Sequence, residues 1–202
     1  QVIIAGGGRV GGLVNRILQA GGMKSTVIDY NARRLEIMAR FGTKHYYGDA
    51  TRPDLLHAAG IDKAHMLVVA VDNRDSINQI VQHVVQAHPH VHVIARAVDR
   101  DHVYHLWGLG CRDIIRETYD STLRISRSAF EARGIPRKTA QAMIDGFHEA
   151  DQEAMLEAAG VYDPDMPIHE NEAYVALVRE RRGAWEAGQR KRMQEILSGE
   201  SE

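Results

Sequence analysis

The sequence predicts an α/β fold, a doubly wound parallel sheet of about six strands followed by a helical carboxy-terminal appendage. Short apolar runs alternate with segments of helical periodicity from the start of the chain to residue 116. The runs are mostly apolar throughout instead of alternating with polar residues, which indicates strands buried on both faces. No run of strand type follows residue 116. These observations together predict a parallel sheet covered by helices on both sides, and then an all-helical segment.

Each element of the predicted sheet domain has its own signal. The expected strands are residues 2–5, 25–29, 45–47, 66–71 and 92–95, with a sixth near 114–115. The expected helices between them are residues 9–20, 33–40, 53–59, 76–87 and 102–107. Gly21 and Gly22 end the first helix, Gly42 follows the second, Pro53 suits the first turn of the third, and Pro89 follows the fourth.

The remaining chain is expected to be helical over residues 118–133, 138–159 with an interruption at Gly146, and 172–197. We therefore expect a sheet domain over 1–116, a helical dimerisation and crossover region over 117–160, and a charged helical tail over 161–202. Gln1 stands directly before an apolar run. This start is expected for a fragment of a longer protein that lacks its amino-terminal part.

Composition excludes several classes of protein. The chain has 202 residues, of which 44% are hydrophobic and 26% charged, as in ordinary globular domains. The net charge of −2 gives no basic field for nucleic acid. The single cysteine, Cys111, excludes an intrachain disulfide framework. No apolar run approaches the roughly 20 residues of a membrane helix.

A glycine-rich loop provides the strongest functional signal. Gly6, Gly8 and Gly11 form a G-x-G-x-x-G pattern that follows a predicted strand and opens a predicted helix. In a Rossmann-like sheet these glycines allow a tight turn, close approach of a phosphate and close packing of helix on strand. Asp29 ends the second predicted strand, where a carboxylate bonds ribose hydroxyls. Arg9, inside the loop, suits a terminal phosphate, and a solvated arginine is the alternative.

Further polar residues follow the other predicted strands, and ligands of such sheets bind outside the carboxyl ends of the strands. The candidate nucleotide-binding residues are Gly6, Gly8, Arg9, Val10, Gly11, Asp29, Tyr30, Asp49, Ala50, Thr51, Asp72, Asn73 and Arg96. Residues 49–51 are equally suited to an N-cap and turn for the helix that begins at Pro53, and the two roles are compatible.

Four other features have competing interpretations. The histidines His88, His90, His92, His102 and His105 are interpreted as surface residues and not as a metal site, because no cysteine or H-E-x-x-H pattern accompanies them. Cys111 is expected to be a buried structural thiol. Residues 139–178 hold nine acidic and no basic residues, and residues 179–192 are rich in arginine. We expect both to be solvated, with a basic partner or anionic lipid as the alternatives.

Several stretches together resemble a known family. They are Val2-Ile-Ile-Ala-Gly-Gly-Gly-Arg-Val-Gly11, Val27-Ile-Asp-Tyr30, Phe41-Gly-Thr-Lys-His-Tyr-Tyr-Gly-Asp-Ala-Thr-Arg52, Asp54-Leu-Leu56, Ile94-Ala-Arg-Ala97 and Arg116-Glu-Thr118. Over about residues 1–160 the chain resembles the nucleotide-binding KTN or RCK domain of potassium transport, and more closely that of glutathione-gated potassium efflux (Kef) antiporters.

The resemblance implies a regulatory domain and not an enzyme. Such domains form homodimers on the cytoplasmic face of the bacterial inner membrane and gate a transmembrane antiporter domain, here expected amino-terminal to Gln1. They hold AMP or another adenine nucleotide, with NAD(H) as the alternative. They also bind glutathione or its adducts near the dimer interface, and an ancillary oxidoreductase subunit often docks on them.

The resemblance also assigns a tentative glutathione site. Arg16 and Arg116 match family arginines, and arginine forks suit the carboxylates of a tripeptide. The third family position is an asparagine, but here it is Asp151. A carboxylate would repel the anionic ligand, so we expect glutathione to bind weakly, and Asp151→Asn to strengthen its binding.

Two other functions fit parts of the sequence. A separately encoded TrkA-like gating subunit would share the sheet domain. An NAD-dependent oxidoreductase would also share it, but would need an acid or base at the nicotinamide. The segment after Arg116 offers no obvious candidate for that group.

Overall fold

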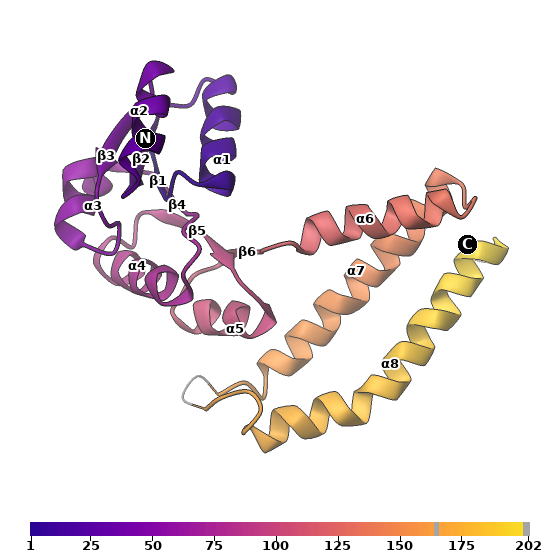
Figure 1. Cartoon of the computed structure of the whole chain (residues 1–202). Helices are drawn as coiled ribbons and strands as arrows, with labels where there is room; N and C mark the ends of the chain where they lie inside the picture. Colours follow the sequence, from indigo (N-terminus) through magenta and orange to yellow (C-terminus); the bar gives the residue numbers. More distant parts are fainter. Residues whose placement is uncertain (164–165, 200–202) are drawn as a thin grey trace. The chain divides into compact units, whose positions relative to one another are not determined.

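The computed structural model describes residues 1–163 and 166–199 and separates into two compact units, Gln1–Glu117 and Thr118–Glu202. The first unit contains a six-stranded sheet in the order β3-β2-β1-β4-β5-β6. Every pair of neighbouring strands is parallel (Figure 1). The predicted fold class, a Rossmann-like doubly wound sheet with a helical appendage, is therefore confirmed.

Most elements lie within two residues of their expected bounds. The strands are β1 (Val2–Ala5), β2 (Ser25–Asp29), β3 (Lys44–Tyr47), β4 (Met66–Val69), β5 (His92–Ala97) and β6 (Asp113–Arg116). The helices of the first unit are α1 (Arg9–Ala20), α2 (Ala32–Arg40), α3 (Pro53–Ala59), α4 (Arg74–Ala87) and α5 (Arg100–Gly108), with a short 3-10 turn η1 (Ile61–Lys63) that the sequence analysis does not predict.

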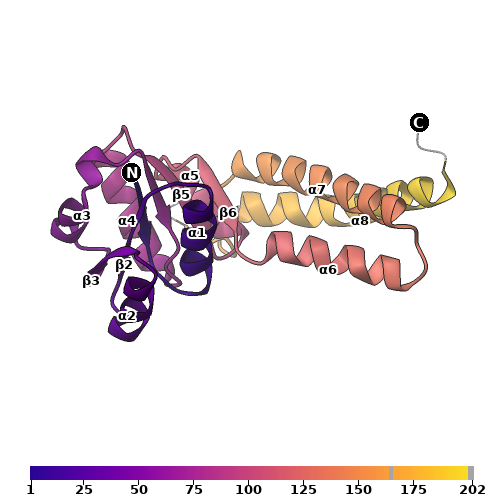
Figure 2. The same cartoon turned by 90° about the horizontal axis from the view of Figure 1, so that it is seen from above.

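The sheet separates two apolar cores because successive side chains of a strand point to opposite faces. In β1, Ile3 and Ala5 belong to the larger core with residues of α3, α4 and α5. Val2 and Ile4 belong to the smaller core, which α1 and α2 cover. Helices on both faces are visible around the sheet in Figure 2. The central strands are thus buried on both sides, as their unbroken apolar runs predict.

Two strand predictions need correction. β3 is an edge strand, and Lys44, His45 and Tyr47 are exposed, so burial on both faces does not hold for it. β4 ends at Val69 and not at Val71. Directly after Val69, the backbone of Ala70 packs against Gly6, the first glycine of the loop. A Cβ atom on Gly6 would lie 3.0 Å from the carbonyl carbon of Ala70.

The second unit consists of α6 (Tyr119–Ala132), α7 (Arg137–Ala159) and α8 (Glu172–Ser198). The expected interruption at Gly146 is wrong, since α7 continues through it. A Cβ atom there would lie 3.1 Å from Nε of Arg192 on α8. The glycine therefore makes room for a side chain of the neighbouring helix. Within the described residues, no helix has the length and apolar character needed to cross a membrane.

Charged groups of α7 and α8 pair with each other. Glu149 and Arg192 are 2.6 Å apart, and Glu157 and Arg181 are 2.8 Å apart. Phe147 meets Trp185 edge to face, with ring centroids 5.6 Å apart. The acidic stretch and the arginine-rich stretch are therefore in part each other's partners, which neither interpretation of them anticipates.

Candidate nucleotide-binding site

The glycine loop between β1 and α1 has the geometry that its pattern predicts. Gly6 has a φ of +96°, which a residue with a side chain rarely adopts. A Cβ atom on Gly11 would lie 1.9 Å from the carbonyl oxygen of Gly6, so only glycine fits there. Gly8 is the N-cap residue of α1 and has no side chain to cap it. The first N–H groups of α1 therefore form a helix terminus suited to an anion.

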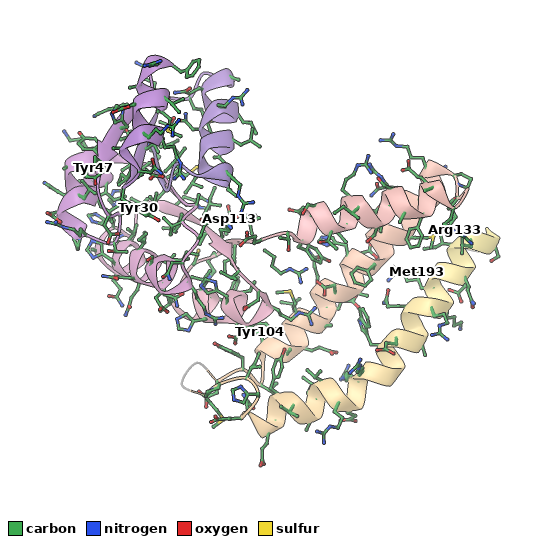
Figure 3. All side chains as sticks on the ribbon, viewed as in Figure 1. Tyr30, Tyr47, Tyr104, Asp113, Arg133 and Met193 are labelled. Atoms are coloured by element: carbon green, nitrogen blue, oxygen red, sulfur yellow. The ribbon has the colours of Figure 1, made fainter. Side chains whose placement is uncertain are left out.

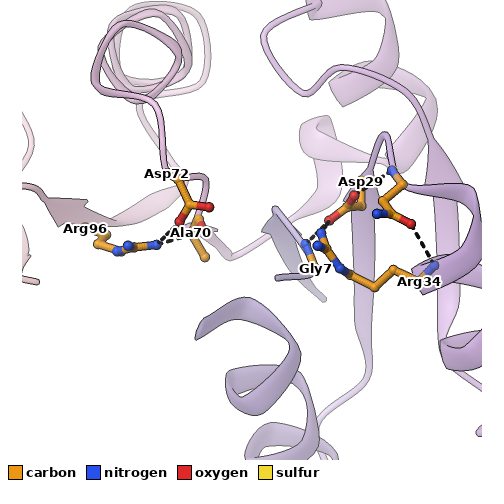
Figure 4. Close-up of polar contacts among 7 residues, drawn as sticks. Gly7, Asp29, Arg34, Ala70, Asp72 and Arg96 are labelled. Carbon is orange, nitrogen blue, oxygen red and sulfur yellow. Dashed lines mark hydrogen bonds and ion pairs between the residues drawn. The ribbon is translucent and has the colours of Figure 1, made fainter. Parts of the chain in front are cut away.

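Asp29 lies beside this loop at the end of β2, and only 4% of it is exposed. One carboxylate oxygen, Oδ2, accepts hydrogen bonds from the N–H of Gly7 (2.6 Å) and from Nη1 of Arg34 (2.7 Å). The other, Oδ1, accepts from the N–H of Asn31 (2.7 Å). Figure 4 shows this cluster. A carboxylate oxygen accepts two hydrogen bonds, so Oδ1 retains capacity for a ribose hydroxyl.

The structure adds two residues to the loop site that the sequence analysis misses. Gly7 donates its N–H to Asp29, and Arg34 forms an ion pair with the same carboxylate while its own side chain remains 41% exposed. The sequence could have indicated Arg34 by its position in the first turn of the predicted helix that follows Asp29. Arg34 is thus a cation held directly beside the loop.

Two tyrosines stand at the carboxyl ends of neighbouring strands β2 and β3. Tyr30 is 74% exposed and Tyr47 is 66% exposed, and both are marked in Figure 3. Tyr30 is a predicted site residue, whereas Tyr47 is not. Exposed aromatic faces next to Asp29 are suited to contact with a nucleotide base.

Residues 49–51 form the predicted turn but not the predicted N-cap. The Asp49 carboxylate accepts a hydrogen bond from the N–H of Thr51 (2.9 Å), which closes the turn after β3. Arg52 is the N-cap residue of α3. The N-cap interpretation is therefore wrong, and the turn places Asp49 and Thr51 at the same edge of the sheet as the loop.

The β4 and β5 ends hold a second polar cluster, also drawn in Figure 4. Arg96, which is 8% exposed, donates from Nη1 to Asp72 Oδ1 (2.7 Å) and to the carbonyl oxygen of Ala70 (3.4 Å). Its Nη2 forms an ion pair with Glu117. Asn73 caps α4 by accepting from the N–H of Ser76 (2.9 Å). Asp72 and Asn73 therefore form this part of the rim of the site, while Glu117 is engaged with Arg96.

The residues of the tentative glutathione site are divided between the two units. Arg16 is exposed on α1, and Arg116 is half-buried at the end of β6, both in the first unit. Asp151 lies on α7 in the second unit, where it is 5% exposed. Both Arg116 and Asp151 have interaction partners within the chain.

His102 corrects the interpretation of the histidines as surface residues, because it is completely buried. Its Nδ1 accepts from the N–H of Val98 (3.1 Å), so Nε2 carries the proton and donates to Oδ1 of Asn78 (2.8 Å). Burial, together with the nearby charge of Arg74, lowers the pKa of His102 to about 4. Among the described residues, no cluster of histidine, cysteine or carboxylate side chains has the arrangement of a metal site.

The lowered pKa of His102 makes stability depend on pH. The unfolded chain takes up this proton below about pH 6.5, whereas the folded chain resists it until about pH 4. The free energy of unfolding should therefore fall by about 3 kcal/mol between pH 7 and pH 4 through this residue. Urea unfolding at several pH values in this range measures the effect. The free energy of unfolding should depend less on pH in His102→Gln than in His105→Gln, and equal pH dependence of the two variants would contradict the assignment.

Cys111 is 1% exposed, and burial raises the pKa of its thiol. The thiol contacts the carbonyl oxygens of Val93 and Asp113, both at 3.5 Å. The expectation of a buried structural thiol is thereby confirmed.

A protein-family model and two KefC proteins match this chain. The TrkA-N domain family model matches residues 2–117. The glutathione-regulated potassium-efflux system protein KefC of Salmonella arizonae is 39% identical over 165 residues, which are 81% of this chain and 27% of that protein. KefC of Cronobacter sakazakii is 41% identical over 160 residues, 79% of this chain and 26% of that protein. The chain thus spans about a quarter of the length of these relatives.

A solved structure matches a longer part of the chain than the family model does. The AMP-bound Kef CTD of Shewanella denitrificans has a TM-score of 0.74 and 35% identity, and the match covers 80% of this chain and 99% of that one.

Proposed function

The chain belongs to the TrkA-N domain family, and from this membership we propose that it is a nucleotide-binding regulatory domain whose ligand is an adenine nucleotide, AMP first. The observation that carries the proposal is the loop of residues 6–11 at the amino terminus of α1, with Asp29 beside it. The AMP-bound state of the matching Kef CTD supports the choice of ligand.

The nucleotide fits this edge of the sheet group by group. The N–H groups at the start of α1 would hold the phosphate, and Arg9, exposed at the first position of that helix, would reach it. Oδ1 of Asp29 would accept from a ribose hydroxyl. Tyr30 and Tyr47 would contact the base.

The wider protein follows from the relatives. We propose that the chain is the cytosolic gating domain of a bacterial potassium:proton antiporter, located at the inner membrane and attached to a transmembrane domain. Weak binding of glutathione or its adducts, at Arg16 and Arg116, and an ancillary oxidoreductase subunit belong to the same proposal. The KefC relatives are named for glutathione-regulated potassium efflux, which supports a regulatory and not a catalytic role.

A homodimer is part of this proposal. Val10, Leu13 and Ile17 recur at the spacing of one helix face on α1 and are 40%, 54% and 62% exposed. An apolar stripe of this kind suits a second copy of the chain. The sequence analysis places the dimer contact in residues 117–160 instead, but Met143 and Ile144 of that region are buried within the chain. Light scattering at micromolar concentration should give the mass of a dimer, and a monomer would contradict this part.

Two alternatives share the sheet domain. A separately encoded TrkA-like subunit would bind the same nucleotide without an attached membrane domain, so the residues that precede Gln1 in the full protein distinguish it. An NAD-dependent oxidoreductase would consume NADH in the presence of a carbonyl substrate, whereas a regulatory domain would not.

Mass spectrometry of the nucleotide released from the purified, denatured chain tests the proposed ligand. We expect AMP or a related adenine nucleotide in near-stoichiometric amount. Release of NADH alone would favour the dinucleotide alternative.

A further inference from the structure

Arg96 connects segments that follow three different strands of the sheet. It lies in β5 and bonds to Ala70 and Asp72 after β4 and to Glu117 after β6. Burial opposes the charge of the guanidinium, but hydrogen bonds to Asp72 and Glu117 outweigh this effect and raise the pKa of Arg96. The side chain is thus a buried, permanently charged link between neighbouring strand ends.

One end of this link reaches the glycine loop. The N–H of Ala70 donates to the carbonyl oxygen of Ala5 (2.8 Å), directly before the loop. The position that a Cβ atom of Gly6 would take lies 3.0 Å from the carbonyl carbon of Ala70, so the two backbones are in close contact. A ligand that moves the loop must therefore move Ala70, whose carbonyl oxygen accepts from Arg96.

The other end reaches the junction between the two units. Glu117 is the last residue of the first unit, and its N–H donates to the carbonyl oxygen of Ala97 (2.7 Å). Thr118 follows with a φ of +64°, and it is the only non-glycine residue with positive φ in the described part of the chain. This conformation is strained for a β-branched residue, and such strain concentrates at functional positions.

We propose that Arg96 is a positioning residue that couples the occupancy of the nucleotide site to the conformation of the junction at residues 117–118. The contacts form one continuous path from Gly6 through Ala70, Arg96 and Glu117 to Thr118, the N-cap residue of α6. In this proposal the strained junction switches between two arrangements, and Arg96 sets the balance between them. This inference rests on the proposed nucleotide function.

Hydrogen exchange of the peptide that spans residues 114–122, measured by mass spectrometry with and without AMP, tests the coupling. In the wild type we expect AMP to change the exchange rate there by about threefold or more. Glu117→Gln removes the negative charge that pairs with Arg96. It should keep the affinity for AMP within about twofold while the exchange response of residues 114–122 disappears.

Two further variants keep the test decisive. Asp101→Asn is the matched control, since it breaks the Arg74–Asp101 ion pair of the first unit (2.5 Å) without touching the path, and its response should equal that of the wild type. Glu117→Asp keeps the charge and should restore part of the response if the Gln variant is poorly folded by circular dichroism.

The outcomes separate this inference from the proposed function. No binding of AMP to the wild type overturns both. Binding of AMP with no change at residues 114–122, or with an equal change in wild type and in folded Glu117→Gln, overturns the coupling alone. A response that is lost in Glu117→Gln and kept in Asp101→Asn supports it.

Discussion

Gly11→Ala should lower the free energy of unfolding by about 4 kcal/mol or more, the range of severe core disruption. The added Cβ would lie 1.9 Å from the carbonyl oxygen of Gly6 and 3.1 Å from Cγ2 of Ile4. The first contact is with backbone, which has no side-chain rotamer available to relieve it. Either α1 must move away from β1, or the loop must change shape. Chemical denaturation followed by circular dichroism measures the effect.

Gly8→Ala is the matched control for Gly11→Ala. Its Cβ would meet only Nη1 of Arg34, at 3.9 Å, and Gly8 has an ordinary negative φ of −68°. Its free energy of unfolding should therefore remain within about 1 kcal/mol of the wild type. Equal stability of the two variants would show that α1 is not packed as closely on the loop as described.

Asp29→Ala should also be severe, with a loss of about 2–5 kcal/mol, because two backbone N–H groups lose the buried carboxylate that accepts from them. The substitution leaves the N–H groups of Gly7 and Asn31 without their acceptor, and it removes the partner of Arg34. It should weaken AMP binding as well, through the lost ribose contact and through the loosened loop. Denaturation and calorimetric titration measure the two effects.

Asp54→Ala is the control for Asp29→Ala, because it shows the effect of removing a paired carboxylate that is not part of the loop site. Asp54 is also paired with an arginine, Arg52, at 2.6 Å, but both side chains are exposed. Pairs of this kind contribute little, so stability and AMP affinity should match those of the wild type. If Asp29→Ala retained stability and AMP affinity as Asp54→Ala does, the buried cluster around the loop would contribute to neither.

The sheet and its glycine loop could be predicted because their signals are local. Glycines at fixed spacing after an apolar run, and a carboxylate at the end of the next strand, specify a turn and its partner without knowledge of distant contacts. The order of the elements follows in the same way from apolar runs separated by helical periodicity. These are the parts where the expected and observed bounds of β1, α1 and β2 coincide.

The remaining features depend on contacts between residues far apart in the chain. Burial of His102 results from α5 packing beside Asn78 of α4. The role of Gly146 within α7 depends on Arg192, 46 residues later, which lies against the position that a Cβ atom would take. The engagement of Arg96 with Glu117 depends on the pairing of β5 with β6. Composition and periodicity carry no information on such contacts, so the roles of these residues could not be predicted from the sequence.

Calorimetric titration of the nucleotide-free chain with AMP tests the central claim most directly, and NADH serves as the competing ligand. The loop at the start of α1, with Asp29 beside it, predicts stoichiometric binding of AMP in the micromolar range or tighter, equivalent to about 8 kcal/mol or more. It also predicts that Asp29→Ala weakens this binding. Absence of AMP binding to a folded wild type, or equal affinity of the Asp29→Ala variant, would contradict the account.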